Sequence, residues 1–297
     1  MSGVLHFTLT EAKSYKYIEI RFYGGAFVKC KGKHITNTGS RQYQSMYTVA
    51  YQSEETYVHE ARILWNSDQS PCGSIGPGMF DLPFQFDIPK NCLGSFQGSV
   101  GSISYSLHGL IKTGVLHSDH RIQVPIQVNR ITDINLPHMM MPLHQSKKKQ
   151  VGFFCSGSDV EFTASLSCTG FCIGQSLPLT VSVVNSSSRR IKMRATIQRY
   201  CYYYAQGLAN QDKRNIACIN TAPIAPHSQQ TVIMEDLIVP MVEPSFDESQ
   251  IIKMQYFLEV TAVIPWARNS SVKIPITFGN VPLSNCTKQV NISFASH

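Results

Sequence analysis

Several features are missing from this sequence, and each absence narrows the class of protein. No apolar run reaches the length of about 18 residues that a membrane-spanning helix needs, and no apolar signal segment follows Met1. Helical periodicity is nearly absent, because no apolar stripe continues over about three helical turns. Charged residues make up only 15% of the chain. We therefore expect a cytoplasmic all-β protein whose strands carry Ser, Thr and Gln on their outer faces.

The motifs of common enzyme sites are missing as well. The sequence contains no G-x-S-x-G elbow, phosphate-binding loop, H-E-x-x-H zinc motif or dinucleotide-binding fingerprint. It also has no zinc-finger spacing and no RNA-recognition motif, and a net charge of +7 does not by itself predict nucleic-acid binding. We therefore predict a protein that is not an enzyme, needs no cofactor or metal and does not bind nucleic acid.

What the sequence does contain is alternation of apolar and polar residues, which is typical of strands that bury one face. From Phe80 to Ile88 every even-numbered residue is apolar, and Pro83 and Pro89 indicate an edge strand because proline has no N–H for a sheet ladder. The same alternation recurs along the chain at Ile103–Ile111, Ile122–Val128, Leu177–Val183, Ile191–Ile197, Ile252–Ile264 and Val272–Phe278.

Residues 131–150 lack this alternation and separate two groups of strands of similar size. Many short strands between Gly, Pro, Asn and Ser turns, without helices, predict β-sandwiches. We therefore predict an N-terminal sandwich at 1–130, a connector at 131–150, a C-terminal sandwich at 151–283 and a short tail at 284–297.

Short motifs in the first half resemble a known family. The run from Gly76 to Tyr105 is similar to the sequence G…FPF.F.LP…SFEG..G.I.Y of α-arrestins, the arrestin domain-containing proteins. The segment that starts at Ile131 is similar to the DLN..P segment of that family. The matching residues in these two stretches include Phe84, Phe86, Pro89, Phe96, Gly98, Asp133 and Asn135.

Motifs of the same family follow in the same order in the second half. They are similar to a G(Y/F)C.GE turn, an N.SSR loop, a PS…IIRV.Y.L.V strand and a closing IGTIPL segment. The matching residues include Gly170, Gly174, Asn185, Pro244, Tyr256 and Pro282. The chain is identified as a member of the α-arrestin family over about residues 3–283.

The resemblance implies two arrestin-like sandwiches of the immunoglobulin type in tandem, and no catalytic site. It implies a non-catalytic adaptor that binds cytoplasmic regions of membrane proteins, such as receptors or transporters, and acts in their trafficking, endocytosis or sorting. Such a protein is expected in the cytoplasm, with peripheral association at the plasma membrane or endosomes.

Two departures from the family pattern affect these expectations. The match starts at Ser2–Val4, in what resembles the family's second strand, so we expect the first strand to be missing and a sheet edge to be exposed. The family recruits ubiquitin ligases through PPxY motifs, which WW domains bind. No PPxY occurs in this sequence, which puts direct recruitment of a ubiquitin ligase in doubt.

Basic residues gather in three places. Lys147, Lys148 and Lys149 lie in the predicted connector, Lys29, Lys31 and Lys33 alternate along an early strand, and Arg190, Lys192 and Arg194 share one face of a later strand. These side chains are candidate contacts for anionic lipid headgroups or acidic, phosphorylated tails. The alternative is an ordinary solvated sheet face.

The nine cysteines predict reduced thiols, because their number is odd and their spacing irregular. Cys168 and Cys172 are interpreted as core or turn cysteines, with a reactive pair as the alternative. One α-arrestin forms a mixed disulfide with thioredoxin, so a redox-regulatory protein acting through Cys218 is an alternative function. A retromer-like coat component is another, because it shares the architecture. His117, Asp119 and His120 favour a solvated turn over a metal site.

Overall fold

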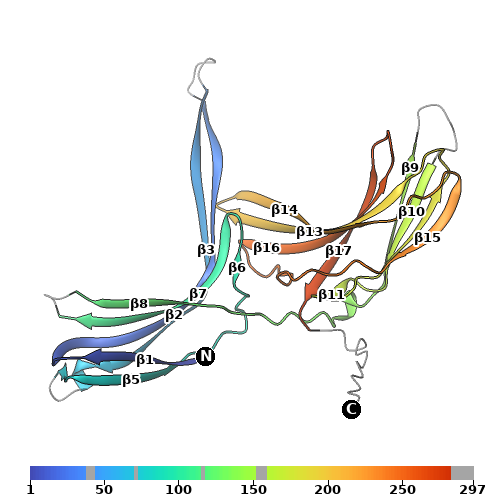
Figure 1. Cartoon of the computed structure of the whole chain (residues 1–297). Coiled ribbons are helices and arrows are strands. Elements are labelled where there is room, and N and C mark those ends of the chain that lie inside the picture. The colour runs from blue at the N-terminus through green and yellow to red at the C-terminus, as the bar shows by residue number, and fades with distance from the viewer. Residues whose placement is uncertain (38–43, 70–72, 115–117, 152–158, 282–297) are drawn as a thin grey trace, which may run out of the picture. The chain divides into compact units, whose positions relative to one another are not determined.

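The computed structural model describes residues 1–37, 44–69, 73–114, 118–151 and 159–281, and most of them lie in strands (Figure 1). The all-β prediction is confirmed, and the helical elements of these ranges are two 3-10 turns, η1 (Ser67–Gln69) and η2 (Pro137–Met139). In the described part of the chain, no helix has the length and apolar character to span a membrane. The strands are β1 (Ser2–Leu9), β2 (Lys13–Asn37), β3 (Gln44–Asn66), β4 (Ser74–Ile75), β5 (Gly78–Gln85), β6 (Phe96–Gln97), β7 (Gly101–Thr113), β8 (His120–Ile126), β9 (Leu143–Gln150), β10 (Asp159–Leu166), β11 (Gly170–Cys172), β12 (Leu179–Asn185), β13 (Lys192–Ala205), β14 (Leu208–Asn220), β15 (Ser228–Met234), β16 (Ile252–Val263) and β17 (Ser270–Gly279).

The chain divides into two compact units. Unit 1 comprises residues 1–130 together with 202–210 and 248–253, and unit 2 comprises the remaining described residues from Ile131 onward. Two short segments of the second half of the sequence therefore belong to the first unit. The domain boundaries predicted from the sequence do not anticipate these segments and stay a prediction.

Unit 1 contains one large and one small sheet. The large sheet has the order β3-β2-β7-β6, with β4 paired to β2 and β8 paired to β7, and the small sheet consists of β1 and β5. In β2 the even-numbered residues from Ile18 to Cys30 are buried. The buried cluster of Tyr15, Ile18 and Ile75 packs against Phe7 and Phe80 of the small sheet. The rings of Phe7 and Phe80 stack across the β1–β5 pair at 5.0 Å. Alternation therefore produces the core of unit 1 as predicted.

Strands β2 and β3 extend beyond the rest of their sheet as a long hairpin, which Figure 1 shows clearly. The pairing of β2 with β7 ends at Val28, opposite Gly101, whereas the pairing of β2 with β3 continues to Asn37. The outer part of the hairpin is therefore a two-stranded ribbon.

Some apolar residues that the alternation places in the core are exposed. Ile122 and Val124 are 57% and 44% exposed, because β8 pairs only with β7 among the described strands and lies at the edge of its sheet. Ile88 is 43% exposed because β5 ends at Gln85, before the predicted strand does. The period of the pattern is right, but the prediction that these faces are covered is wrong.

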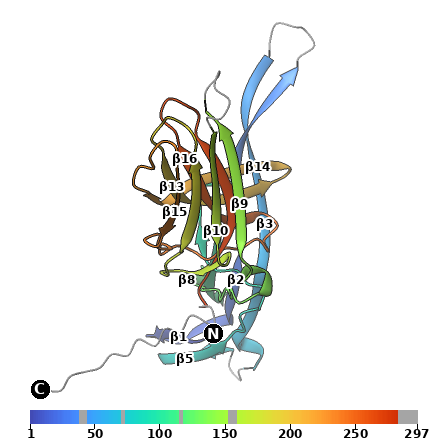
Figure 2. The ribbon, with the colours of Figure 1, turned by 90° about the vertical axis from the view of Figure 1, so that its right-hand side faces the viewer.

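Unit 2 contains a sheet in the order β15-β12-β10-β9 and a sheet in the order β11-β17-β16-β13-β14. Figure 2 shows β9 beside β10, its antiparallel partner. The apolar residues predicted from Leu177 to Val183 and from Ile191 to Ile197 are fully buried. Those of β16 from Met254 onward are also fully buried. Their alternation with polar residues explains why each sheet has one face in the core.

The predicted connector contains regular structure. Residues 143–150 form β9, which pairs with β10 from Leu143–Leu166 to Gln150–Asp159. No strand was expected within 131–150, but the structure places β9 in the second half of that segment. The reason is that β9 is an edge strand with many polar residues, so it lacks the alternation of a half-buried strand.

The first part of that segment is anchored in unit 2 by Ile134, which is fully buried. A Cβ atom added to Gly279 would lie 2.5 Å from Ile134 Cγ2 and 2.5 Å from the Thr132 carbonyl oxygen. A Cβ added to Gly170 would lie 3.1 Å from Ile134 Cβ. The two glycines therefore leave room for the Ile134 side chain and for the backbone beside it.

We expect Gly279→Ala to lower the free energy of unfolding by about 1–3 kcal/mol, since a methyl group would overpack the site against backbone that cannot move away freely. The matched control is Gly76→Ala, because an added Cβ there meets nothing within 4 Å. Urea unfolding of both variants checks the prediction. Equal midpoints for Gly279→Ala and the unaltered protein would contradict it.

Candidate binding surfaces

Three lysines at odd-numbered positions of β2 form a basic row on the exposed face of the ribbon. Lys29, Lys31 and Lys33 are exposed, whereas Cys30 on the opposite face is fully buried. The residues directly opposite the lysines on β3 are Gln52, Ala50 and Thr48, none of which is a carboxylate. The alternation predicted for these lysines is confirmed, while their role in binding stays a prediction.

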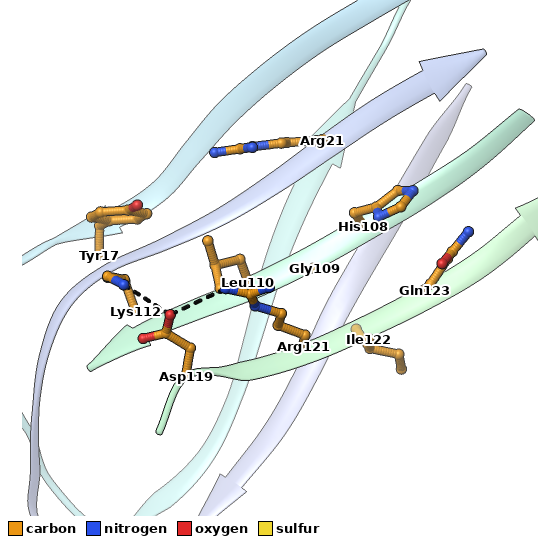
Figure 3. Close-up of a pocket in the computed structure, with 10 residues that line it drawn as sticks. All are labelled: Tyr17, Arg21, His108, Gly109, Leu110, Lys112, Asp119, Arg121, Ile122 and Gln123. Carbon is orange, nitrogen blue, oxygen red and sulfur yellow. Dashed lines mark hydrogen bonds and ion pairs between the residues drawn. The ribbon is translucent and has the colours of Figure 1, made fainter. Parts of the chain in front are cut away.

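The same strand face leads into a hollow of about 600 Å³ on the large sheet of unit 1. Figure 3 shows its lining, which comes from β2, β7 and the start of β8. Asp119 lies between two cations, Lys112 at 2.8 Å and Arg121 at 3.5 Å. Arg21 is paired with Glu19 on the same strand. The hollow therefore holds cations that are already engaged by carboxylates.

Asp119 is the carboxylate that pairs with two cations in this hollow. The hydrogen bond from Lys112, together with the backbone N–H of Thr113 and the guanidinium of Arg121, lowers the pKa of Asp119 to about 2. Of the residues interpreted as a solvated turn, His117 lies outside the described residues. Within the described ranges, no cluster of three or more His, Cys, Asp or Glu side chains could hold a metal ion.

The three lysines of β9 do not form one surface. Lys147 and Lys149 lie opposite the buried residues Phe162 and Val160 of β10, so they share the inward face of this edge strand. Inward charges on an edge strand discourage pairing with other strands. Lys148 lies on the outer face, and its hydrogen bond with Asp159 (3.0 Å) raises the pKa of Lys148.

Arg190, Lys192 and Arg194 all point to solvent, as the period of two predicts. Their neighbours Ile191 and Met193 are fully buried, which fixes the exposed side of the strand. Arg194 donates to the side-chain oxygen of Asn220 at 3.1 Å. The geometry thus agrees with the predicted basic face, and its use as a binding surface stays a prediction.

The cysteines differ in accessibility. Cys168 and Cys172 are buried thiols, and Cys168 donates to the Gly170 carbonyl oxygen at 3.3 Å. Cys218 on β14 is exposed and accepts a hydrogen bond from Thr196 Oγ1 at 3.6 Å. Among the cysteines within the described ranges, Cys218 is the exposed one.

The family-motif residues have structural roles where the structure describes them. Asp133 accepts hydrogen bonds from the backbone and side chain of Asn135, and the backbone bond lowers the pKa of Asp133. In unit 1, a Cβ on Gly98 would lie 2.1 Å from the Tyr203 hydroxyl. Gly174 adopts φ +84°, which favours glycine. Pro282 lies outside the described residues.

The other motif residues contribute mostly to the cores and to loop contacts. Phe86, Phe96 and Tyr256 are buried, whereas Phe84 is partly exposed. The carbonyl of Pro89 accepts a hydrogen bond from the Cys92 N–H at 3.0 Å. Ser245, the residue after Pro244, accepts a hydrogen bond at Oγ from the Phe278 N–H at 2.9 Å. The Asn185 side chain donates to the carbonyl oxygens of Arg189 and Ala225, which lie in two loops. The motif residues that the structure describes thus lie at several places in the two units, and their structural role stays a prediction.

Reasoning from the sequence missed the hollow around Asp119. Its residues lie far apart in the chain, and only the pairing of β2 with β7 and of β7 with β8 brings them together. The sequence offered one signal, the acidic residue Asp119 beside a predicted turn. That signal did not indicate that Lys112 or Arg21 would line the same hollow. Strand register is needed to find such a cluster.

Two family models match the chain in tandem. The model of the arrestin (or S-antigen) N-terminal domain matches residues 1–135, and the model of the C-terminal domain matches residues 156–283. These matches and the paired β-sheets define the class, a protein with two arrestin domains. The chain belongs to the arrestin family, and its similarity to arrestin domain-containing proteins places it among the α-arrestins.

Three relatives illustrate this similarity. Arrestin domain-containing protein 4 of Homo sapiens is 29% identical over 267 residues, which cover 88% of this chain and 62% of the relative. The Mus musculus protein of the same name is 29% identical, covering 77% of this chain and 56% of the relative. Arrestin domain-containing protein 1 of Rattus norvegicus is 26% identical, covering 96% and 62%. The chain thus spans less than two thirds of the length of these relatives.

We expect Asp119→Asn to flatten the pH dependence of stability in acid. The pKa of Asp119 in the folded protein, about 2, lies below its ordinary value of 3.8. Asp119 therefore stabilises the fold above about pH 4, and this contribution is lost as the pH falls toward 2. Urea unfolding at several pH values between 2 and 6 measures the slope. The exposed control Asp87→Asn should keep the original slope, and an unchanged slope in Asp119→Asn would disprove the assignment.

Proposed function

We propose that this chain is a non-catalytic adaptor that binds cytoplasmic regions of membrane proteins and acts in their trafficking, endocytosis or sorting. The observation that carries the proposal is the tandem match to both arrestin domains, in order, along most of the chain. An adaptor of this kind works in the cytoplasm, with peripheral association at the plasma membrane or endosomes.

The exposed basic strand faces support this function. Arg190, Lys192 and Arg194 form one row of cations on unit 2, and Lys29, Lys31 and Lys33 form another on unit 1. Cations in an ordered row attract acidic or phosphorylated tails and anionic lipid headgroups, because both carry several negative charges. A rigid sheet holds such a row in place without a further loss of backbone entropy.

Strand β1 offers a second mode of binding. Among the described strands, β1 pairs only with β5, so its other edge carries free backbone donors and acceptors. An apolar hollow of about 480 Å³ borders this edge and is lined by residues such as Val4, Leu107 and Ile122. An extended segment of a partner would add to β1 as a strand and place apolar side chains in the hollow.

One alternative function keeps a specific observation in its favour. The exposed Cys218 would suit a redox-regulatory α-arrestin that forms a thiol-dependent complex with thioredoxin. Recruitment of a ubiquitin ligase would need a route other than a PPxY motif within these 297 residues.

Reversal of the basic row with Arg190→Glu, Lys192→Glu and Arg194→Glu tests the adaptor proposal. We expect at least tenfold weaker binding to an acidic phosphoserine peptide, since each cation near an anionic surface contributes about 1 kcal/mol. Titration by fluorescence anisotropy at low and physiological salt measures the effect, which salt should reduce.

The matched control reverses three other exposed lysines, Lys13, Lys16 and Lys90, and so changes the net charge equally. It should bind the peptide nearly as the unaltered protein does. If the two triple variants bind equally, general charge accounts for binding and the row of Arg190, Lys192 and Arg194 has no specific role.

Hydrogen–deuterium exchange tests strand addition at β1. Adding a tail peptide should slow amide exchange from Val4 to Leu9, because new ladder hydrogen bonds would protect the free edge. Exchange in β12, which has partners on both sides, serves as the internal control. No change in β1 at a saturating peptide concentration would count against this mode of binding.

A further inference from the structure

Strand β15 lies at one edge of a sheet in unit 2, and Figure 1 shows it at the margin of that sheet. Among the described strands it pairs only with β12, from Leu179–Met234 to Asn185–Ser228. Backbone N–H and C=O groups along its other edge therefore have no ladder partner in the described part of the chain. Such groups are available to hydrogen-bond with a further strand.

The other edge strands of unit 2 each have a feature that discourages pairing. Strand β9 carries three consecutive lysines, and two of them, Lys147 and Lys149, share its inward face. Strand β14 carries consecutive charged residues at 212–214, and β11 is only three residues long. Charge and short length are devices by which natural proteins prevent edge-to-edge pairing. The edges formed by β9, β14 and β11 are therefore protected.

Strand β15 has none of these protective features. Its sequence is SQQTVIM, which contains no charged residue, proline or glycine. Three β-branched residues, Thr231, Val232 and Ile233, lie together and favour extended backbone. Gln229 and Thr231 are exposed, and Ile233 is 60% exposed. An exposed edge of this composition, with nothing in its sequence to prevent pairing, indicates an interface with another strand.

A second copy of β15 is the partner that this edge fits. Val232 lies opposite the buried Val181, so the even-numbered residues of β15 face inward. Two identical strands that pair antiparallel about a two-fold axis perpendicular to the sheet keep their inward faces on the same side. Like charges would repel across such an axis, and β15 has none. A strand without charge also has nothing with which to select an acidic or a basic segment of another protein.

We propose that two copies of this chain associate through β15, so that the sheets containing β15 in the two copies join into one continuous antiparallel sheet. Pairing over the whole strand places Thr231 opposite Thr231 at the axis and Gln229 opposite Ile233, which covers part of the exposed Ile233 side chain. A pair of seven-residue strands forms a small interface, so the dimer is weak and depends on concentration. The proposal concerns an edge that the adaptor function does not use, and it holds whether or not tails bind.

A disulfide trap tests the proposed register directly. The Cα atoms of opposite residues in an antiparallel pair lie about 4.5–5.5 Å apart, which is within the range that a disulfide spans. Thr231→Cys should therefore give a disulfide-linked dimer when the whole chain is mildly oxidised. The two copies of residue 229 would lie about 13 Å apart along the strands, so Gln229→Cys, the matched control, should give little dimer.

Both cysteine variants are made with Cys218→Ser, because Cys218 is the exposed cysteine within the described ranges. All other cysteines are then the same in the two variants, so a difference between them reports on the β15 edge alone. Gel electrophoresis without reducing agent measures the fraction of dimer. Equal amounts of dimer from Thr231→Cys and Gln229→Cys would overturn the proposed pairing.

A charge placed on the edge tests the association without oxidation. Thr231→Lys sets two lysines opposite each other at the two-fold axis, so the dissociation constant of the dimer should rise at least tenfold. The melting temperature of the monomer should change little, because Thr231 is exposed. The control Val184→Lys adds the same charge to the outer face of the same sheet, on the interior strand β12, and should leave association nearly unchanged.

Sedimentation velocity over a series of protein concentrations measures the dissociation constants. The unaltered protein should pass from monomer to dimer as its concentration rises. A monomer at every concentration, or a dimer of equal stability in Thr231→Lys and the unaltered protein, would contradict the proposal. If Thr231→Lys does not fold, the comparison of the two cysteine variants still decides the question.

Discussion

The burial of every second side chain is the constraint on which the rest of this structure depends. In β12 the residues Leu179, Val181 and Val183 are fully buried, so the residues between them must face outward. A shift of one residue would move the whole apolar set into water. The same constraint applies at the start of β13, where the buried Ile191 and Met193 alternate with Arg190, Lys192 and Arg194, so these three cations face solvent. The candidate binding faces are therefore consequences of core packing.

This constraint also explains how much could be predicted from the sequence. Alternation was sufficient to predict β12, β13, β16 and β17, including the long buried face of β16. It could not show which sheet edges stay uncovered, so Ile122 and Val124 were expected in the core. Edge strand β9 was missed because its lysines replace the apolar residues of a half-buried strand. The contacts of Asp119 depend on strand register, which local pattern does not contain.

Exposed rows of basic side chains occur in both units within the described part of the chain. Lys29, Lys31 and Lys33 belong to unit 1, and the row of Arg190, Lys192 and Arg194 belongs to unit 2. Carboxylates neutralise the cations around Asp119, which makes that hollow a poorer site for anions than the open rows. An adaptor that meets acidic tails at a membrane would use such open rows.

Proximity labelling in cells tests the central claim, the adaptor function, most directly. The chain is fused to a labelling enzyme, and a fusion with Cys218→Ser is measured in parallel. The account predicts that the labelled proteins are mainly membrane proteins with cytoplasmic regions, and that Cys218→Ser leaves this set unchanged. Labelling dominated by thioredoxin and lost in Cys218→Ser, or by one stable coat assembly, would contradict the account.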